Sequence, residues 1–189
     1  MVALEKGLGR LALLIFSIAP GIAQSSRPEV PYVPTTDAAV LAMLKLADVR
    51  KTDVVYDLGC GDGRIVIAAA TLYGAHGVGI DINPQRIHEA KENAMKAGVE
   101  DLVRFEQNDL FKANIREATV VTLFLLQKVN LRLRPKLLKE LRPGTRIVSN
   151  TFDMGDWKPE KEETLASGDE GHGLGLSRQL FLWIIPQRQ

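Results

Sequence analysis

The feature that most constrains the fold is the stretch from residue 53 to residue 70, which reads DVVYDLGCGDGRIVIAAA. Residues 54–56 are apolar and rich in the side chains that favour buried strands. Three glycines follow at alternate positions, and the alanine-rich run at 65–70 predicts a buried helix. Strand, glycine turn and helix in this order typically begin a nucleotide-binding α/β unit, because backbone without side chains can approach a ligand closely.

The spacing of Gly59, Gly61 and Gly63 narrows the choice of ligand. The dinucleotide-binding fingerprint requires another glycine three residues after Gly61, where this chain has Arg64. A P-loop is excluded because no Gly-Lys-Ser/Thr sequence follows the glycines. What remains is an acidic residue, Asp57, followed by the alternating glycines. The alternative interpretation is a tight strand-to-helix turn that binds no ligand.

Composition and length limit the number of domains and the classes of partner. The chain has 189 residues and a formal net charge of +1, which suits one globular domain and gives no general reason to expect a nucleic-acid partner. Cys60 is the sole cysteine, so no internal disulfide can form. Its place between two glycines indicates either a reactive thiol at a helix N-terminus or a small side chain that fits the turn. His172 lies among glycines without a partner at metal-ligand spacing, and we expect no metal site.

The next predicted strand, residues 77–80, ends at Asp81, about 20 residues beyond the glycine loop. An acidic residue there is placed to accept hydrogen bonds from both hydroxyls of a ribose. Ile82 follows, and we expect it to lie against the face of an adenine.

A third strand is predicted around residues 103–107 and leads into Asn108, Asp109 and Leu110. An acidic side chain at the end of this strand can accept a hydrogen bond from the exocyclic amine of adenine. An Asn-Asp pair taken alone is also an ordinary turn. Its position after the glycine loop and Asp81 favours the ligand-binding interpretation.

Together, the motif at 57–63, Asp81 and residues 108–110 resemble the class I S-adenosylmethionine (SAM) methyltransferases. The resemblance implies SAM as cofactor, with Asp57 near its amino group, the loop from Gly59 through Cys60 to Gly63 along its methionine moiety, and adenine near Asp109. It also implies a Rossmann-like α/β fold: a sheet of seven strands, mostly parallel, with the last strand antiparallel and helices on both faces. The alternation of predicted strands and helices indicates the same class independently.

Three stretches are similar to a narrower family of small lysine methyltransferases. These are residues 31–35 (PYVPT), 54–66 and 141–157. Mitochondrial members of that family modify the ATP synthase c subunit and the adenine nucleotide translocase. The resemblance implies protein-lysine N-methylation, with a protein as partner. Two other classes remain open: a small-molecule or RNA methyltransferase, and an exported binding module that keeps the fold without catalysis.

The acceptor is expected beyond residues 118–126, the strongest β-strand pattern in the chain. Ligands of open α/β sheets bind at the carboxyl ends of strands, so the next residues should lie beside the transferred methyl group. Gln127 and Asn130 are the candidate catalytic residues there, together with Tyr32 from the N-terminal segment. DNA-adenine methyltransferases carry Asp/Asn-Pro-Pro-aromatic at this place, and this chain does not.

A helix is predicted over residues 131–141, with Pro135 interrupting its start. Basic residues are frequent in and around it. They are either a solvated face or a docking surface for an acidic protein, a membrane lipid or a nucleic acid. These residues are Lys128, Arg132, Arg134, Lys136, Lys139, Arg142 and Arg146.

The N-terminus, residues 1–23, has the pattern of a secretory signal or a short membrane anchor. Lys6 and Arg10 precede an apolar run at 11–19, which is shorter than the roughly 20 residues of a membrane-spanning helix. A cytoplasmic tail is the third interpretation. SAM is made in the cytoplasm, so the cofactor favours the cytoplasmic side whereas the apolar run favours export or proximity to a membrane.

Between this segment and the predicted domain at 37–189 lies a proline-rich stretch, residues 24–36. Proline fixes φ and disfavours helix, so the stretch is expected to be extended. Its apolar residues indicate that it packs over the cofactor cleft rather than acting as a spacer.

Overall fold

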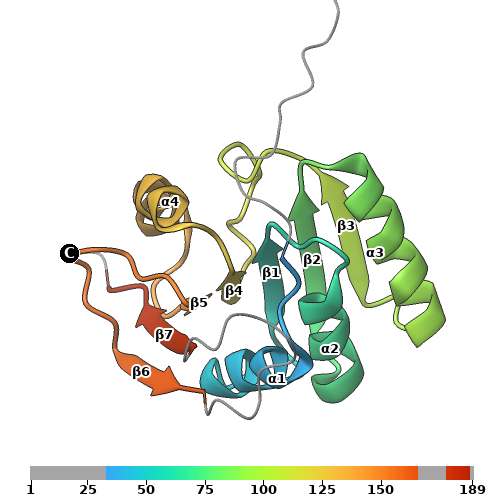
Figure 1. Ribbon diagram of the computed structural model, residues 1–189, viewed down its shortest axis with the longest axis horizontal. Helices are drawn as coiled ribbons and strands as arrows, with labels where there is room; N and C mark the ends of the chain where they lie inside the picture. The colour runs from blue at the N-terminus through green and yellow to red at the C-terminus, as the bar shows by residue number, and fades with distance from the viewer. Residues whose placement is uncertain (1–32, 166–177, 188–189) are drawn as a thin grey trace, which may run out of the picture.

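The computed structural model describes residues 33–165 and 178–187. The predicted segment at 1–23 and residues 24–32 of the predicted segment at 24–36, including Tyr32, lie outside the described residues. A sheet of seven strands forms the centre, in the spatial order β3-β2-β1-β4-β5-β7-β6 (Figure 1). The strands are β1 (Val54–Leu58), β2 (His76–Asp81), β3 (Val103–Gln107), β4 (Val120–Leu123), β5 (Arg146–Asn150), β6 (Lys161–Thr164) and β7 (Gln179–Ile184).

Neighbouring strands from β1 to β5 are parallel, and β7 is antiparallel to both β5 and β6. This confirms the predicted sheet. The register pairs Leu58, at the end of β1, with Ile80 of β2 on one side and Leu123 of β4 on the other. The segments that leave the carboxyl ends of β1 to β4 therefore meet at one edge of the sheet.

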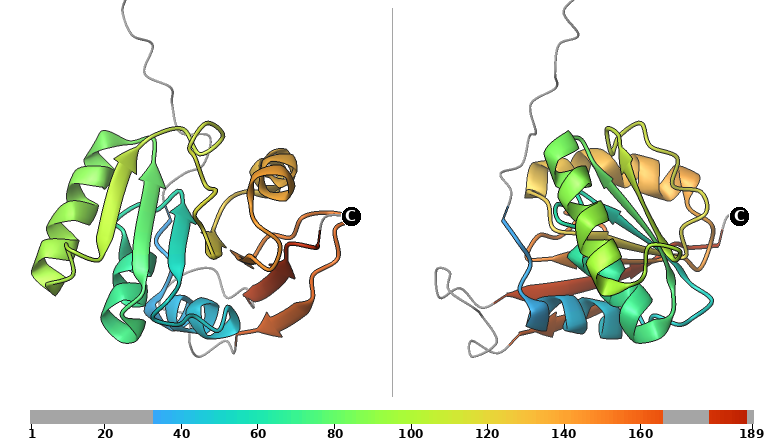
Figure 2. Two further views of the ribbon diagram at one scale, coloured as in Figure 1. Left: turned by 180° about the vertical axis from the view of Figure 1, so that it is seen from behind. Right: turned by 90° about the vertical axis from the view of Figure 1, so that its right-hand side faces the viewer.

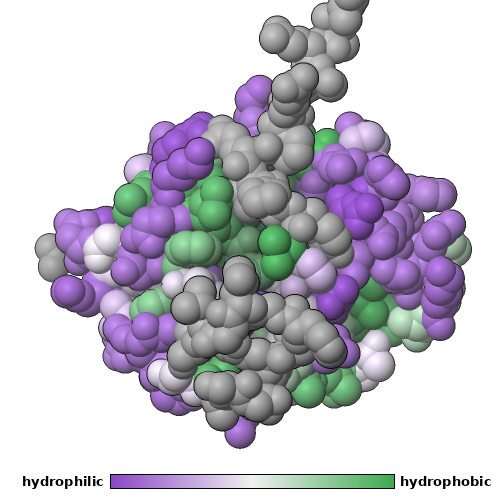
Figure 3. All heavy atoms as spheres, in the orientation of Figure 1, coloured by the Kyte–Doolittle hydropathy of each residue, from purple (hydrophilic) through white to green (hydrophobic). Residues whose placement is uncertain are grey.

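Helices cover both faces of the sheet, as predicted (Figures 1 and 2). α1 (Asp37–Leu46), α2 (Arg64–Tyr73) and α3 (Pro84–Ala97) pack on one face, and α4 (Gln127–Glu140) packs on the other. Side chains alternate between the two cores, so Val55 faces the three helices while Tyr56 and Leu58 face the α4 side. On the side seen in Figure 1, hydrophilic side chains cover α3, and hydrophobic surface is exposed nearer the middle of the molecule (Figure 3).

Local sequence explains where the helices begin and end. The Thr36 hydroxyl accepts a hydrogen bond from the Ala39 N–H at 3.3 Å and caps α1. Asn83 caps α3 ahead of a proline in its first turn. Gly74 and Gly98 end α2 and α3 in the left-handed conformation that glycine adopts without strain.

The predicted strand at 118–126 is wrong in length, because β4 ends at Leu123. Its neighbours explain the difference. Leu123 pairs with Leu58, the last residue of β1, and with Ser149 near the end of β5. Beyond Leu58 the chain turns into the glycine loop, so residues 124–126 have no partner on that side and remain outside the strand despite their β propensity.

The predicted start of the fourth helix is also wrong. α4 begins at Gln127, and Pro135 lies inside the helix rather than at its start. Pro135 is exposed, so water can hydrogen-bond to the carbonyl group that loses its N–H partner. Within the described ranges, no helix has the length and hydropathy required to cross a bilayer.

Candidate active site

A cavity of about 230 Å³ lies at the carboxyl edge of the sheet, where the segments following β1 to β4 meet. Asp57, Asp81 and Asp109 all line it, as the sequence predicts for three carboxylates around one ligand. Other predicted ligand-binding residues in its wall are Gly59, Cys60, Gly61, Ile82, Asn108 and Leu110.

The glycine loop follows β1 directly and is held against β2. The N–H groups of Gly59 and Cys60 both donate to the Ile80 carbonyl, at 2.8 and 3.0 Å. Gly63 has φ +80°, and a Cβ there would lie 2.7 Å from the ring of Phe105. Gly63 is not among the residues that line the cavity, so its contribution is the close approach of the loop to β3.

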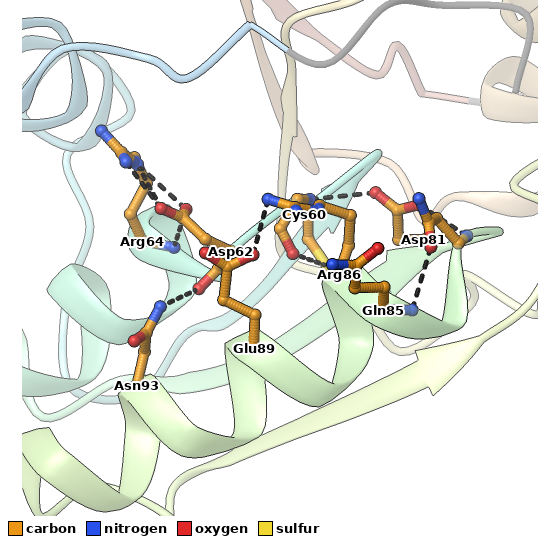
Figure 4. A network of polar contacts seen from close by, with 10 residues as sticks. Cys60, Asp62, Arg64, Asp81, Gln85, Arg86, Glu89 and Asn93 are labelled. Atoms are coloured by element: carbon orange, nitrogen blue, oxygen red, sulfur yellow. Dashed lines mark hydrogen bonds and ion pairs between the residues drawn. The ribbon is translucent and has the colours of Figure 1, made fainter.

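Asp81, at the end of β2, is oriented by the loop itself. Its Oδ2 accepts from the Gly61 N–H at 3.0 Å, and its Oδ1 accepts from the Asn83 N–H at 2.8 Å (Figure 4). A carboxylate has about four acceptor sites, so lone pairs remain for a ligand. This geometry suits a diol, whose two hydroxyls donate to one carboxylate.

Asp57 lies deeper, 3% exposed, and its Oδ1 accepts a hydrogen bond from the Thr122 hydroxyl at 2.8 Å. Burial raises the pKa of the Asp57 carboxyl to about 7; the Thr122 hydrogen bond lowers it, and the nearby Asp81 and Asp62 raise it. A buried carboxyl next to other carboxyls is stabilised in its charged form by a cation. The floor of the cavity therefore suits a positively charged ligand group such as an α-ammonium.

After β3, Asn108 and Asp109 form a hydrogen-bonded turn. The Asn108 N–H donates to the Asp81 carbonyl at 3.0 Å, and Asp109 Oδ1 accepts from the Phe111 N–H at 2.9 Å. The turn interpretation and the ligand-binding interpretation are therefore compatible: backbone hydrogen bonds fix a carboxylate that also lines the cavity.

Cys60 is 4% exposed, and burial raises the pKa of its thiol well above the usual value, with a further increase from Asp57 and Asp81. A protonated, buried thiol is a poor nucleophile. Cys60 therefore acts as a small side chain that fits the turn.

Several residues of the cavity wall are apolar. Phe124 and Leu125 leave β4, Val129 comes from α4, and Phe111 comes from the loop after β3. The Arg132 guanidinium lies over the Phe111 ring, 4.2 Å from its centroid. The side chains of Phe111, Phe124, Leu125 and Val129 suit an aliphatic group, and Arg132 adds one cation to this part of the wall.

The cavity wall does not include Gln127 or Asn130. Gln127 donates to Asp153, while the Asn130 amide donates to Ser149 Oγ and to the Phe152 carbonyl, both at 3.1 Å. Both side chains tie α4 to β5 and its following loop, because they lie on the side of α4 that faces β5. Their catalytic role stays a prediction that this placement does not support, and Tyr32 lies outside the described residues.

Two wall residues lie in stretches that the sequence placed at the site, Val33 in the segment over the cleft and Val129 beyond the fourth strand. The wall residues not identified from the sequence are Pro34, Thr35, Asp62, Arg64, Ile65, Ile80, Asn83, Arg86, Phe111, Phe124, Leu125 and Arg132. The apolar residues of 24–36 did indicate a segment over the cleft, and residues 33–35 confirm it. Among the residues at 33–165 and 178–187, no group of three or more histidine, cysteine, aspartate or glutamate side chains is arranged to hold a metal ion.

A family model described as the ANTKMT methyltransferase domain matches residues 57–161, more than half of the chain. The chain belongs to this family. The matched range contains the glycine loop, the three carboxylates and every residue of the cavity wall except those at 33–35.

Related proteins align over most of the chain. A protein-lysine N-methyltransferase of Saccharolobus islandicus is 48% identical over 86% of this chain and 98% of its own length. The adenine nucleotide translocase lysine N-methyltransferase of Mus musculus is 34% identical over 83% of this chain and 69% of its own length. A solved structure described as an RNA methyltransferase from Salinibacter ruber, in complex with S-adenosyl-L-homocysteine, is 52% identical, with a TM-score of 0.75 over 83% of this chain and 96% of that one. This ANTKMT-family protein is a SAM-dependent methyltransferase.

Proposed function

We propose that the enzyme methylates lysine side chains of proteins. The observation that carries the proposal is the 48% identity, over 98% of its length, to a protein-lysine N-methyltransferase. The family description agrees with it, and so do the names of the vertebrate relatives, which are lysine methyltransferases of the ATP synthase c subunit and of adenine nucleotide translocase.

We propose the following placement of the cofactor, whose sulfonium group supplies the methyl. The buried Asp57 carboxylate would hold the α-ammonium, and Asp81 the ribose hydroxyls. Ile82 would lie on the adenine, and Asp109 would accept from its amine. These assignments would leave the apolar wall at Phe124, Leu125 and Val129 for the acceptor.

The apolar wall supports a lysine acceptor on physical grounds. A lysine amine must lose its proton before its lone pair can attack the methyl carbon. Burial against Phe124, Leu125 and Val129 would lower the pKa of the amine, because a low dielectric disfavours the ammonium form. The same wall would align the aliphatic stem of lysine with the methyl group, and alignment is the main contribution required of the protein.

RNA is the other acceptor class that a relative's description names. The charge distribution favours protein. Net charge is +1, and three of the predicted basic residues pair with acids: Arg134 with Asp156, Lys136 with Glu140 and Arg146 with Asp53. A surface that binds a phosphate backbone needs cations that phosphates can pair with.

The test is to incubate the purified enzyme and methyl-labelled SAM with a cell extract in which the acceptor is still unmethylated. We expect label in protein that resists nuclease, and methyllysine after acid hydrolysis. Label that nuclease releases, or label in the small-molecule fraction, would contradict the proposal.

The matched control is Asp81→Asn, which keeps the size of the side chain. It should lose labelling and bind SAM about tenfold or more weakly in calorimetry, since a hydrogen bond to a charged group is worth roughly 1.5–3 kcal/mol. Equal SAM affinity in both proteins would refute the cofactor placement while leaving the acceptor assignment to the labelling result.

We further propose that residues 1–23 act as a signal or membrane anchor that brings the enzyme near a membrane. The proposal rests on the sequence pattern alone. Fractionation of cells, with N-terminal sequencing of the mature protein, tests it. An intact N-terminus in the soluble fraction would refute it.

A further inference from the structure

Residues 33–35 form a strap, the short extended segment that precedes α1 and supplies one wall of the cofactor cavity. Unlike the other walls, it belongs neither to the sheet nor to a helix or loop leaving the carboxyl end of a strand. Its last residue, Thr35, is 5% exposed, whereas Val33 is 53% exposed. The strap is therefore fixed at its inner end and reaches outward along the cavity.

One side chain fixes the inner end. Arg64 Nη1 donates to the backbone carbonyl of Thr35 at 2.6 Å. The next residue, Thr36, is already held by its cap on α1, so the bond from Arg64 sets the direction in which the strap leaves the helix.

Arg64 is itself held in a fixed orientation. Its Nε and Nη2 donate to the two carboxylate oxygens of Asp62, at 2.9 and 2.6 Å, in a bidentate pair (Figure 4). Asp62 lies between two glycines of the loop, and its carbonyl accepts from the Asn93 amide of α3 at 3.0 Å. A continuous chain of contacts thus connects α3, the glycine loop, α2 and the strap.

We infer that Arg64 is a positioning residue that latches the strap over the cavity, and that release of this latch gates the exchange of cofactor and product. The latch joins one part of the protein to another. Weakening it therefore lowers the barrier to opening whether the cofactor is entering or leaving. The product meant here is the demethylated cofactor. The inference rests on the proposed placement of the cofactor in this cavity and does not depend on the proposed lysine acceptor.

Arg64→Lys tests the latch. Lysine keeps the charge beside Asp62, but its single nitrogen cannot hold the bidentate pair and the Thr35 carbonyl in the same geometry. We expect the association and dissociation rate constants of labelled SAM, measured by rapid mixing and by chase, to rise together by about tenfold or more, the value of a charged hydrogen bond. The dissociation constant should change less than either rate.

Pro34→Gly tests the strap without touching Arg64. Glycine lets the strap adopt more conformations when it is open, which favours opening. The association and dissociation rate constants should therefore both rise about two- to fivefold. Arg50→Lys is the matched control, because Arg50 pairs with Asp48 on the surface, with side chains 70% and 67% exposed; its rates should equal those of wild type.

Three results would overturn the inference. Rates within a factor of two of wild type in Arg64→Lys would show that no latch limits exchange. Faster dissociation with unchanged or slower association would show that Arg64 binds the cofactor or supports the loop instead. If Arg64→Lys fails to fold, as judged by circular dichroism, unchanged rates in a folded Pro34→Gly variant would refute gating by the strap.

Discussion

The raised pKa of Asp57 predicts that SAM binding weakens in mild acid. With a pKa of about 7, half of the Asp57 carboxyls are protonated near pH 7, and a protonated carboxyl cannot pair with the α-ammonium of the cofactor. The apparent dissociation constant scales as 1 + 10^(pKa − pH). It should therefore be about 11 times its limiting value at pH 6 and about 1.1 times at pH 8, a tenfold difference, or roughly 1.4 kcal/mol.

Isothermal titration calorimetry at pH 6, 7 and 8 measures this directly. If the bound carboxylate stays ionised throughout, binding should release about 0.9 protons per site at pH 6, 0.5 at pH 7 and 0.1 at pH 8 from Asp57. Repeating each titration in two buffers with different ionisation enthalpies counts those protons. Equal affinity at pH 6 and pH 8 would refute the reasoning.

Asp57→Asn supplies the control. The α-amino group of the cofactor titrates near pH 8 itself, and this contribution persists in the variant, so the difference between the two proteins isolates Asp57. The variant should bind SAM about tenfold or more weakly at pH 8, without the loss of affinity between pH 8 and pH 6. An unchanged pH dependence in the variant would assign the effect to another group.

The raised pKa of Asp57 also affects folding stability, but in the opposite direction: SAM binding strengthens as pH rises, whereas the free protein becomes less stable. Between the ordinary aspartate pKa of 3.8 and about pH 7, the folded protein holds a proton on Asp57 that the unfolded chain has lost. The unfolding free energy therefore falls as pH rises through this window, by at most roughly 4 kcal/mol from this group. Saturating SAM should offset the loss at the upper end of the window, which thermal unfolding at pH 5 and pH 8 can measure.

Three substitutions test the scaffold. Arg146→Met leaves the buried Asp53 carboxylate without its ion-pair partner. The free energy of unfolding in urea should fall by about 3–5 kcal/mol while SAM affinity stays unchanged, and a fall below about 1 kcal/mol would contradict this. Gly79→Ala should cost about 1–3 kcal/mol, since the new Cβ would lie 2.6 Å from the Phe105 ring, and an unaltered Tm would contradict it. Asn130→Ala should lower the free energy of unfolding by about 1–3 kcal/mol, because Asn130 hydrogen-bonds to Ser149 and to the loop after β5. The turnover rate should stay within a factor of about three of wild type. A turnover rate reduced about 100-fold or more at equal stability would restore the catalytic role of Asn130.

The sequence predicted those residues of the site that belong to a short, continuous strand-and-loop pattern. Asp57 and Asp81 lie at the carboxyl ends of β1 and β2, and the glycines follow β1. The apolar pattern of both strands is visible in a window of a few residues. Because parallel strands end at a shared edge, their order along the chain was enough to predict one common cavity.

What the sequence did not predict depends on partners that are distant along the chain. Arg64 bonds to Thr35, 29 residues earlier, and nothing in the sequence around either residue indicates the pair. The length of β4 is set by where β1 turns away, not by the propensities of residues 124–126. Gln127 follows the expected strand, but the helix begins there and directs its side chain to Asp153.

The position of β7 between β5 and β6 has a consequence for synthesis of the chain. β6 emerges from the ribosome before β7, yet its backbone pairs within the sheet only with β7 among the described strands. Until residues 179–184 are available, β6 lacks a template and the outer side of β5 is an open edge that can pair with another nascent chain. This half of the sheet is thus expected to assemble last, and to be where chaperones protect the growing polypeptide.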